Sequence, residues 1–183
     1  MPRGTVIAVP ASDVIENPAA RMKLRLVRTA AETDGELLEM EATYEPGSVE
    51  PVEHFHPKQD EHFEVLAGTI EARVGDERRR LTAGDTLDVP AGTVHAMWNG
   101  GGEPAQVIWQ TRPALRSEEF FRLVGRLARE GRLTPKGPSN PLLGAAVMQE
   151  FRDEFRPTNP PAPIQAVAFP VLATFGRALG QRP

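Results

Sequence analysis

Two stretches of the chain decide the fold: GSVEPVEHFHPKQDEHFEVLAG at residues 47–68 and GDTLDVPAGTVHAMWN at residues 84–99. Glycines and prolines punctuate both stretches, and the runs between them are short and rich in alternating apolar residues. Such runs are typical of β-strands that end in tight turns. The two stretches also hold all four histidines of the chain. They therefore predict a β structure that carries a histidine cluster.

Strand-like runs continue on both sides of these stretches, from Arg21 to about Arg112. The runs of strand length are KLRLV, ELLEMEATY, HFEVLA, TIEARV, DTLDV, HAMW and AQVIWQ. Turn-forming pairs such as Asp34-Gly35 and Ala83-Gly84 separate them. Short strands at such regular spacing predict a sandwich or a barrel.

The length of 183 residues favours one main domain with an extension. We expect an N-terminal arm with joining strands over residues 1–34, a barrel core over 35–112 and a helical extension over 113–183. The chain has no cysteine, which excludes disulfides, iron–sulfur clusters and thiol nucleophiles. Any metal must therefore be bound through nitrogen and oxygen.

Charge is distributed unevenly along the chain. Residues 1–112 carry 11 basic and 19 acidic side chains, whereas residues 113–183 carry 10 basic and 6 acidic ones. An acidic body argues against nucleic acid as a partner. We expect the basic extension to pack on an acidic barrel, its own or a neighbour's. The first residues have no apolar segment followed by a cleavage site, so we predict a cytoplasmic protein.

The period of apolar residues becomes helical after Pro113. One amphipathic helix is predicted with Ser117 as its N-cap and Gly131 as its stop, and a second from Asn140 through the run that ends at Phe155. The last apolar stretch predicts one or two short helices that cover a hydrophobic surface. Its polar and proline interruptions leave it short of the roughly 20 apolar residues of a membrane span, so no span is expected, and an interfacial anchor is the less favoured alternative to the covering helices.

Side chains alternate between the two faces of a strand, so residues an even number of positions apart share a face. This parity selects the residues that face a common centre. His54 and His56 stand two apart and point to one face of a strand, because side chains alternate along it. Glu61 shares parity with Phe63 and Val65, which favours it as a ligand over its neighbour Asp60.

The same parity turns His62 to the other face, as a surface or interface residue. His95 follows a turn formed by Pro90 and Gly92, which would place it on a neighbouring strand. Imidazole and carboxylate together suit a divalent transition metal, and three histidines with one glutamate leave coordination positions open for a ligand.

These residues carry a family resemblance. The positions that resemble the two motifs of the cupin superfamily are Gly47, His54, His56, Glu61 and Gly68, then Gly84, Pro90, Gly92, His95 and Asn99. Six residues rather than the usual five separate Gly47 from His54, which leaves the ligands unchanged. The resemblance implies a mainly β fold, an antiparallel jelly-roll barrel followed here by two or three α-helices. It also implies a metal bound by His54, His56, Glu61 and His95, and a homodimer.

Parity further predicts which side chains line the pocket: Met40, Tyr44, Phe63, Val65 and Met97. Either Val107 and Trp109 or Ile108 and Gln110 should join them. This lining is apolar, which favours a small hydrophobic or aromatic substrate over a sugar phosphate.

The resemblance leaves two functions open. The first is a dioxygenase-like oxidoreductase with one divalent transition metal (Fe, Mn, Ni, Cu or Zn), in which Glu61 also acts as a base. The second is a non-catalytic or isomerase-type small-molecule binder. The helical extension either caps the mouth of the barrel or lies across a dimer interface.

Overall fold

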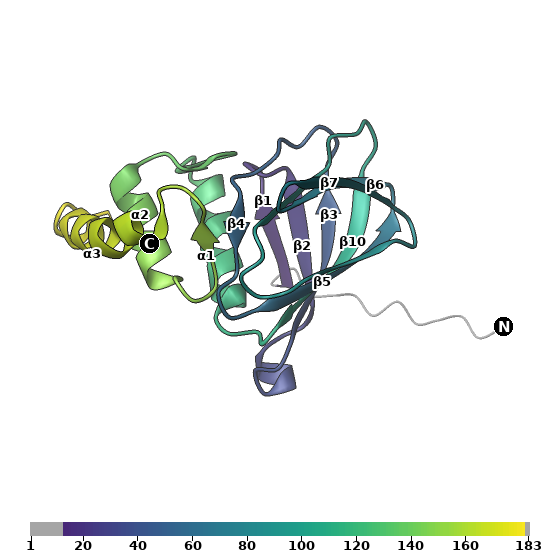
Figure 1. Cartoon of the computed structure of the whole chain (residues 1–183), viewed down its shortest axis with the longest axis horizontal. Coiled ribbons are helices and arrows are strands. Elements are labelled where there is room, and N and C mark those ends of the chain that lie inside the picture. Colours follow the sequence, from purple (N-terminus) through teal and green to yellow (C-terminus); the bar gives the residue numbers. More distant parts are fainter. Residues whose placement is uncertain (1–12, 182–183) are drawn as a thin grey trace.

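The computed structural model describes residues 13–181, and its main feature is a pair of antiparallel β-sheets packed face to face with helices at one end (Figure 1). The predicted jelly-roll barrel followed by two or three helices is therefore confirmed. Residues 1–12 lie outside the described residues. They include the start of the predicted N-terminal arm and of the region in which no signal peptide was predicted.

The larger sheet holds six strands among the described residues. In spatial order they are β1 (Val14–Asn17), β2 (Met22–Arg28), β3 (Leu38–Tyr44), β10 (Ala105–Arg112), β5 (Asp60–Ala67) and β8 (Thr86–Val89). The sheet therefore extends into residues 14–28. A 3-10 helix, Ala31–Thr33, lies in the connection between β2 and β3, which projects from the end of the barrel (Figure 1).

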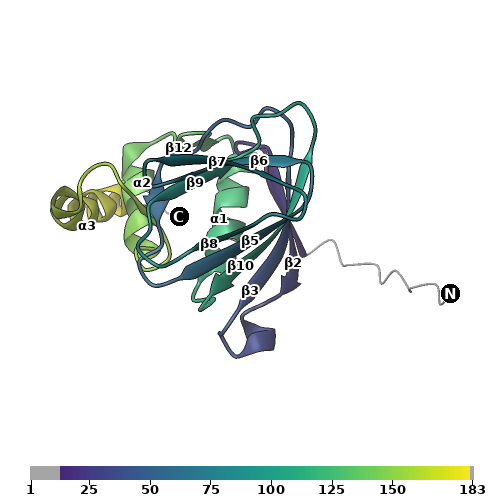
Figure 2. The same ribbon diagram turned by 45° about the vertical axis from the view of Figure 1, so that its right-hand side comes forward.

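The smaller sheet faces the larger one across the barrel interior (Figure 2). Its strands, in spatial order, are β13 (Arg156–Pro157), β4 (His54–Phe55), β9 (His95–Trp98), β6 (Thr69–Val74) and β7 (Glu77–Thr82). A separate two-stranded ribbon joins β11 (Leu133–Thr134) to β12 (Gly137–Pro138). The strand β13 comes from the helical extension, with Pro157 opposite His54, so the extension is hydrogen-bonded to the barrel.

The inward faces of the strands follow the predicted alternation. Along β3 the buried positions alternate with half-buried ones, from Leu38 to Tyr44. On β10 it is Val107 and Trp109 that point inward, with Trp109 9% exposed.

The turn glycine Gly68 has a φ of +77°, and a Cβ there would lie 2.4 Å from the carbonyl oxygen of Pro104. Both the positive φ and the lack of space for a Cβ therefore require glycine at this position.

The extension holds three α-helices among the described residues. They are α1 (Ser117–Arg129), α2 (Pro141–Glu150) and α3 (Ala162–Ala178). The predicted N-cap role of Ser117 was wrong, because Ser117 is the first helical residue and its hydroxyl accepts a hydrogen bond from Gln59 Nε2 at 2.8 Å. Gly131 follows α1 with a φ of +70°, in agreement with the predicted stop.

The second helix is shorter than predicted. It begins as expected after Asn140, whose side chain accepts from the Leu142 N–H, but it ends at Glu150 rather than Phe155. Arg156 precedes a proline, which disfavours helical backbone, and it pairs with β4 instead. The last stretch forms one continuous helix with Pro170 inside it.

The helices pack on the barrel through α1 and on one another through a second apolar core. A Cβ on Gly125 of α1 would lie 2.8 Å from the Ile15 side chain and 2.9 Å from the Glu16 carbonyl oxygen, so α1 lies close against β1. The second core consists of Leu123, Leu127, Leu143, Val147 and Phe151.

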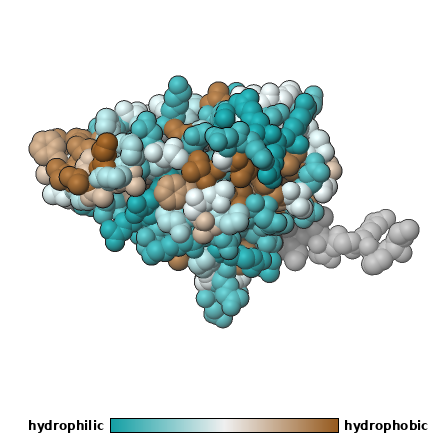
Figure 3. Space-filling view, in the orientation of Figure 1, coloured by the Kyte–Doolittle hydropathy of each residue, from teal (hydrophilic) through white to brown (hydrophobic). Residues whose placement is uncertain are grey.

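One side of α3 is covered by α2, and the other side is open. Its large exposed apolar residues are Ile164, Val167, Val171 and Phe175, and Leu179 follows as the C-cap. Figure 3 shows apolar residues gathered at the end of the molecule where α3 lies. Within residues 13–181, no helix combines the length and the apolar character needed to cross a membrane.

Candidate metal centre

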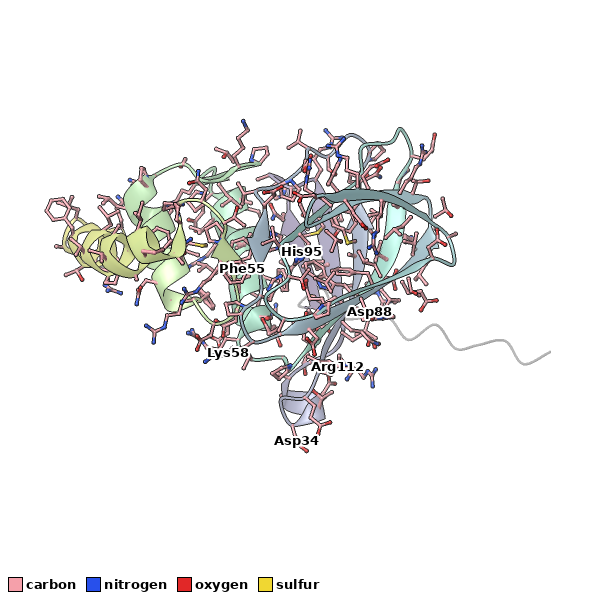
Figure 4. All side chains as sticks on the ribbon, in the orientation of Figure 1. Asp34, Phe55, Lys58, Asp88, His95 and Arg112 are labelled. Atoms are coloured by element: carbon pink, nitrogen blue, oxygen red, sulfur yellow. The ribbon has the colours of Figure 1, made fainter. Side chains whose placement is uncertain are left out.

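Three imidazoles meet inside the barrel. His54 on β4 stands directly opposite His95 on β9, and His56 follows two residues later along the chain. One ring nitrogen from each of the three lies within 4.8 Å of the other two. Figure 4 shows His95 in the interior, whereas the labelled Asp88 and Arg112 lie toward the edge of the barrel. The strand pairing has therefore brought together the three histidines that the sequence predicted as ligands.

Glu61 enters the same centre from the opposite sheet. Its Oε2 lies 2.9 Å from His95 Nε2 and 3.2 Å from His56 Nε2, and the residue is 2% exposed. The rival Asp60 is exposed and accepts a hydrogen bond from the Ala91 N–H at 2.8 Å. His62 lies away from the cluster, with its Nδ1 2.6 Å from Asp88 Oδ1.

Each clustered imidazole has its Nδ1 engaged by a backbone carbonyl. The His54 Nδ1 lies 3.0 Å from the Val52 oxygen, and the His95 Nδ1 lies 3.0 Å from the Thr93 oxygen. The third Nδ1, that of His56, contacts the carbonyl oxygen of Glu154 in the helical extension. A nitrogen that donates to a carbonyl carries the proton, so each neutral ring presents its Nε2 lone pair to the centre.

The protonation states of His54, His56 and Glu61 also suit metal binding. Burial, reinforced by the neighbouring imidazoles, lowers the pKa of His54 to about 3, and burial likewise lowers the pKa of His56. Burial opposes charge on His95 too, but the Glu61 carboxylate 2.9 Å away outweighs it and raises the pKa of His95, so a metal must displace a proton from this ring. The surrounding imidazoles overcome the burial of Glu61 and lower its pKa. Neutral imidazoles beside an ionised carboxylate are the forms that bind a metal.

The histidine nitrogens and the Glu61 carboxylate oxygen are arranged in a way that suits a bound cation. Among the described residues, the buried His56 Nε2 and Glu61 Oε2 have no hydrogen-bond partner. When both are unprotonated, their lone pairs face each other at 3.2 Å, an arrangement that is unfavourable without a proton or a cation between them. Three imidazole nitrogens and one carboxylate oxygen match the preferences of a divalent transition metal. The residues present can therefore hold such an ion.

Two aromatic side chains support the centre. Trp109 Nε1 donates to Glu61 Oε1 at 2.9 Å, which fixes the carboxylate and leaves Oε2 for the histidines. The ring of Phe155 stacks on His54, with centroids 4.5 Å apart and planes 22° apart. Parity left Trp109 as one of two alternatives, and the helical pattern around Phe155 gave no signal of a role at the site.

A cavity of about 120 Å³ adjoins the histidines and has mainly apolar walls. Of the predicted pocket residues, Tyr44, Phe63 and Met97 line it, while Met40 and Val65 lie in the barrel core. Burial, together with the charge of Glu61, raises the pKa of Tyr44, so its hydroxyl stays protonated. No residue of the described chain forms a hydrogen bond with that hydroxyl, which makes Tyr44 a free donor at the cavity wall.

The barrel matches a known family. Residues 40–111 match the family model described as a cupin domain. Residues 40–111 form a cupin domain. The three helices of the extension lie outside this match.

The relatives match part of this chain rather than the whole of it. A segment of 61 residues is 36% identical to the tetracenomycin polyketide synthase protein TcmJ of Streptomyces glaucescens, and it covers 33% of this chain and 41% of TcmJ. An RmlC-like cupin from Shewanella frigidimarina aligns with a TM-score of 0.51 and 20% identity, over 62% of this chain and 95% of that one. KdgF from Halomonas aligns with a TM-score of 0.51 and 19% identity, over 60% and 96%. At these identities the two structures support the fold alone.

Proposed function

We propose that this cupin domain binds one divalent transition metal and acts as a dioxygenase-like oxidoreductase on a small apolar or aromatic substrate with an enol or phenol oxygen. The observation that carries the proposal is the cluster of three imidazoles with the buried Glu61 carboxylate beside an apolar cavity. A bound metal of this class supplies a Lewis acid for the substrate oxygen and, for iron, manganese, nickel or copper, redox chemistry with dioxygen. Addition of both oxygen atoms to the substrate requires no further reductant.

The residues of the chain have distinct roles in this proposal. Glu61 Oε1 is held by Trp109, so Oε2 is the oxygen that serves as a ligand or accepts the proton of a substrate hydroxyl. The protonated Tyr44 hydroxyl donates a hydrogen bond to a substrate oxygen. The apolar walls exclude water, which strengthens both polar interactions.

Metal content tests the ligand set. We expect purified protein to contain about one transition-metal ion per chain, measured by mass spectrometry, and we expect His54→Ala, His56→Ala or His95→Ala to lose it. His62→Ala is the matched control, because His62 lies outside the cluster and its loss should leave the metal content unchanged. Full metal content in all three cluster variants would refute the centre.

Oxygen consumption separates the two functions. The metal-reconstituted protein should consume dioxygen with at least one member of a panel of enolic and catecholic compounds. Native zinc, or no oxygen uptake with any compound, would favour the alternative of a non-catalytic or isomerase-type binder.

A further inference from the structure

A second cavity, of about 310 Å³, lies between the barrel and the helical extension. We refer to it as the barrel–helix pocket. Its walls include Phe120, Phe121 and Val124 of α1, Leu133 of β11, and Phe155 beside the histidines. Its volume lies at the lower end of the roughly 300–1,000 Å³ that small-molecule pockets occupy.

The barrel–helix pocket adjoins the histidine cavity. Ala20, Met22 and Pro135 form part of the walls of both. Phe155, which lines the pocket, stacks on His54, which lines the cavity. The two spaces therefore meet beside the candidate metal centre.

Aromatic rings form a continuous wall along this junction. Phe120 stacks on Phe155 with centroids 5.3 Å apart, and it also contacts Phe121 at 5.7 Å. Phe121 in turn meets Trp109 of the histidine cavity edge to face at 5.0 Å. Rings at such distances present flat apolar surfaces and edges that suit an aromatic ligand. Lys136 is the one charged residue among the described residues that line the pocket.

Size decides how the two spaces can be used. The histidine cavity, at about 120 Å³, is well below the usual volume of a ligand pocket, so it holds little more than the reacting end of a molecule. The barrel–helix pocket supplies the remaining volume on the open side of the histidines.

We propose that the barrel–helix pocket binds the apolar body of an elongated, ring-containing substrate, whose hydroxyl-bearing end lies in the histidine cavity. The proposal rests on the proposed function for the role of the hydroxyl end, whereas the pocket itself can be tested without it. Substrates of this class have at least two fused or linked rings, because a single ring would leave the barrel–helix pocket empty.

Binding of 2-naphthol, with phenol for comparison, tests the pocket. Val124→Trp places an indole in the pocket from α1, and we expect it to weaken 2-naphthol binding by at least about tenfold in a fluorescence titration. Phenol binding should change by less than about twofold. Thr134→Trp fills the pocket from an exposed position of β11 and should have the same effect, which guards against a folding defect in the α1 variant.

Val167→Trp is the matched control, because Val167 is 72% exposed on α3 and lines neither space. It should bind 2-naphthol as the unaltered protein does. If the unaltered protein does not bind 2-naphthol, or if both pocket variants bind it as tightly as the control, the proposal is overturned.

Metal content and cobalt spectra separate this proposal from the proposed function. The pocket variants should retain their metal, since neither residue belongs to the cluster. In cobalt-loaded protein, 2-naphthol should shift the visible spectrum, and Val124→Trp should abolish the shift. Binding without a spectral shift would overturn the placement of the hydroxyl end. Absence of metal would refute the proposed function, while the titrations would still decide whether the pocket binds 2-naphthol.

Discussion

Each histidine of the cluster uses one ring nitrogen for the backbone and leaves the other for the centre. Two of the acceptors, the Val52 and Thr93 carbonyls, lie two residues before the histidines that they fix, so local backbone geometry orients those rings. The third acceptor is Glu154, 98 residues from His56, and only the tertiary fold supplies it. The carboxylate of Glu61 is likewise oriented from a distance, by Trp109.

Trp109→Phe tests this support at the residue scale. The substitution removes the donor to Glu61 Oε1 and leaves a buried carboxylate oxygen unpaired, which costs about 1–3 kcal/mol of stability. Loss of such an outer contact typically lowers metal affinity by about 10–100-fold, which competition with a chelator measures. Trp98→Phe is the control, since the structure shows no hydrogen bond from Trp98 to Glu61, and equal affinities in the two variants would contradict the role of Trp109.

Close contacts between elements fix the extension on the barrel. The helix α1 lies against β1 at Gly125, and β13 adds a short strand beside β4. The chain between α2 and β13 carries Glu154, whose buried side chain accepts a hydrogen bond from the Arg116 N–H at 3.3 Å. These contacts hold the Glu154 carbonyl and the Phe155 ring in place over the histidines.

Gly125→Ala tests the contact between α1 and β1. Alanine favours helix over glycine by about 1 kcal/mol, but the new methyl group would collide with Ile15 and with the Glu16 backbone. Overpacking of this kind costs about 1–3 kcal/mol, so we expect a net loss of stability in a denaturant titration. Gly144→Ala in α2 is the matched control, because its Cβ would meet only Pro138 at an ordinary 3.7 Å. If Gly125→Ala were as stable as the control, the close packing of α1 on β1 would be refuted.

At the scale of the whole molecule, the extension closes one end of the barrel. It contributes a strand to the smaller sheet, an aromatic ring over His54 and one wall of the barrel–helix pocket. Of the two predicted roles, capping of the mouth therefore has direct contacts within the described chain. The homodimer stays a prediction, and light scattering of the intact protein would check it.

Deletion of residues 113–183 should expose the surfaces that the extension covers. Ile15 is 3% exposed and Trp109 is 9% exposed in the intact molecule, and both contact α1. Their exposure creates a contiguous apolar patch, so we expect the truncated protein to aggregate. Size-exclusion chromatography measures this outcome, with the full-length chain as the control. A soluble, monodisperse truncation would contradict the covering role.

The two motifs, through their resemblance to those of the cupin superfamily, were enough to predict the barrel and the group of His54, His56, Glu61 and His95. Strand alternation, a local rule with a period of two, predicted that His54 and His56 share a face and favoured Glu61 over Asp60, and glycine and proline marked the turns between strands. The folded structure was needed to show that Trp109 holds Glu61, that α2 ends at Glu150 and that Phe155 covers His54. Those contacts join residues far apart in the chain, and no local period specifies which distant partner a side chain or a carbonyl will meet.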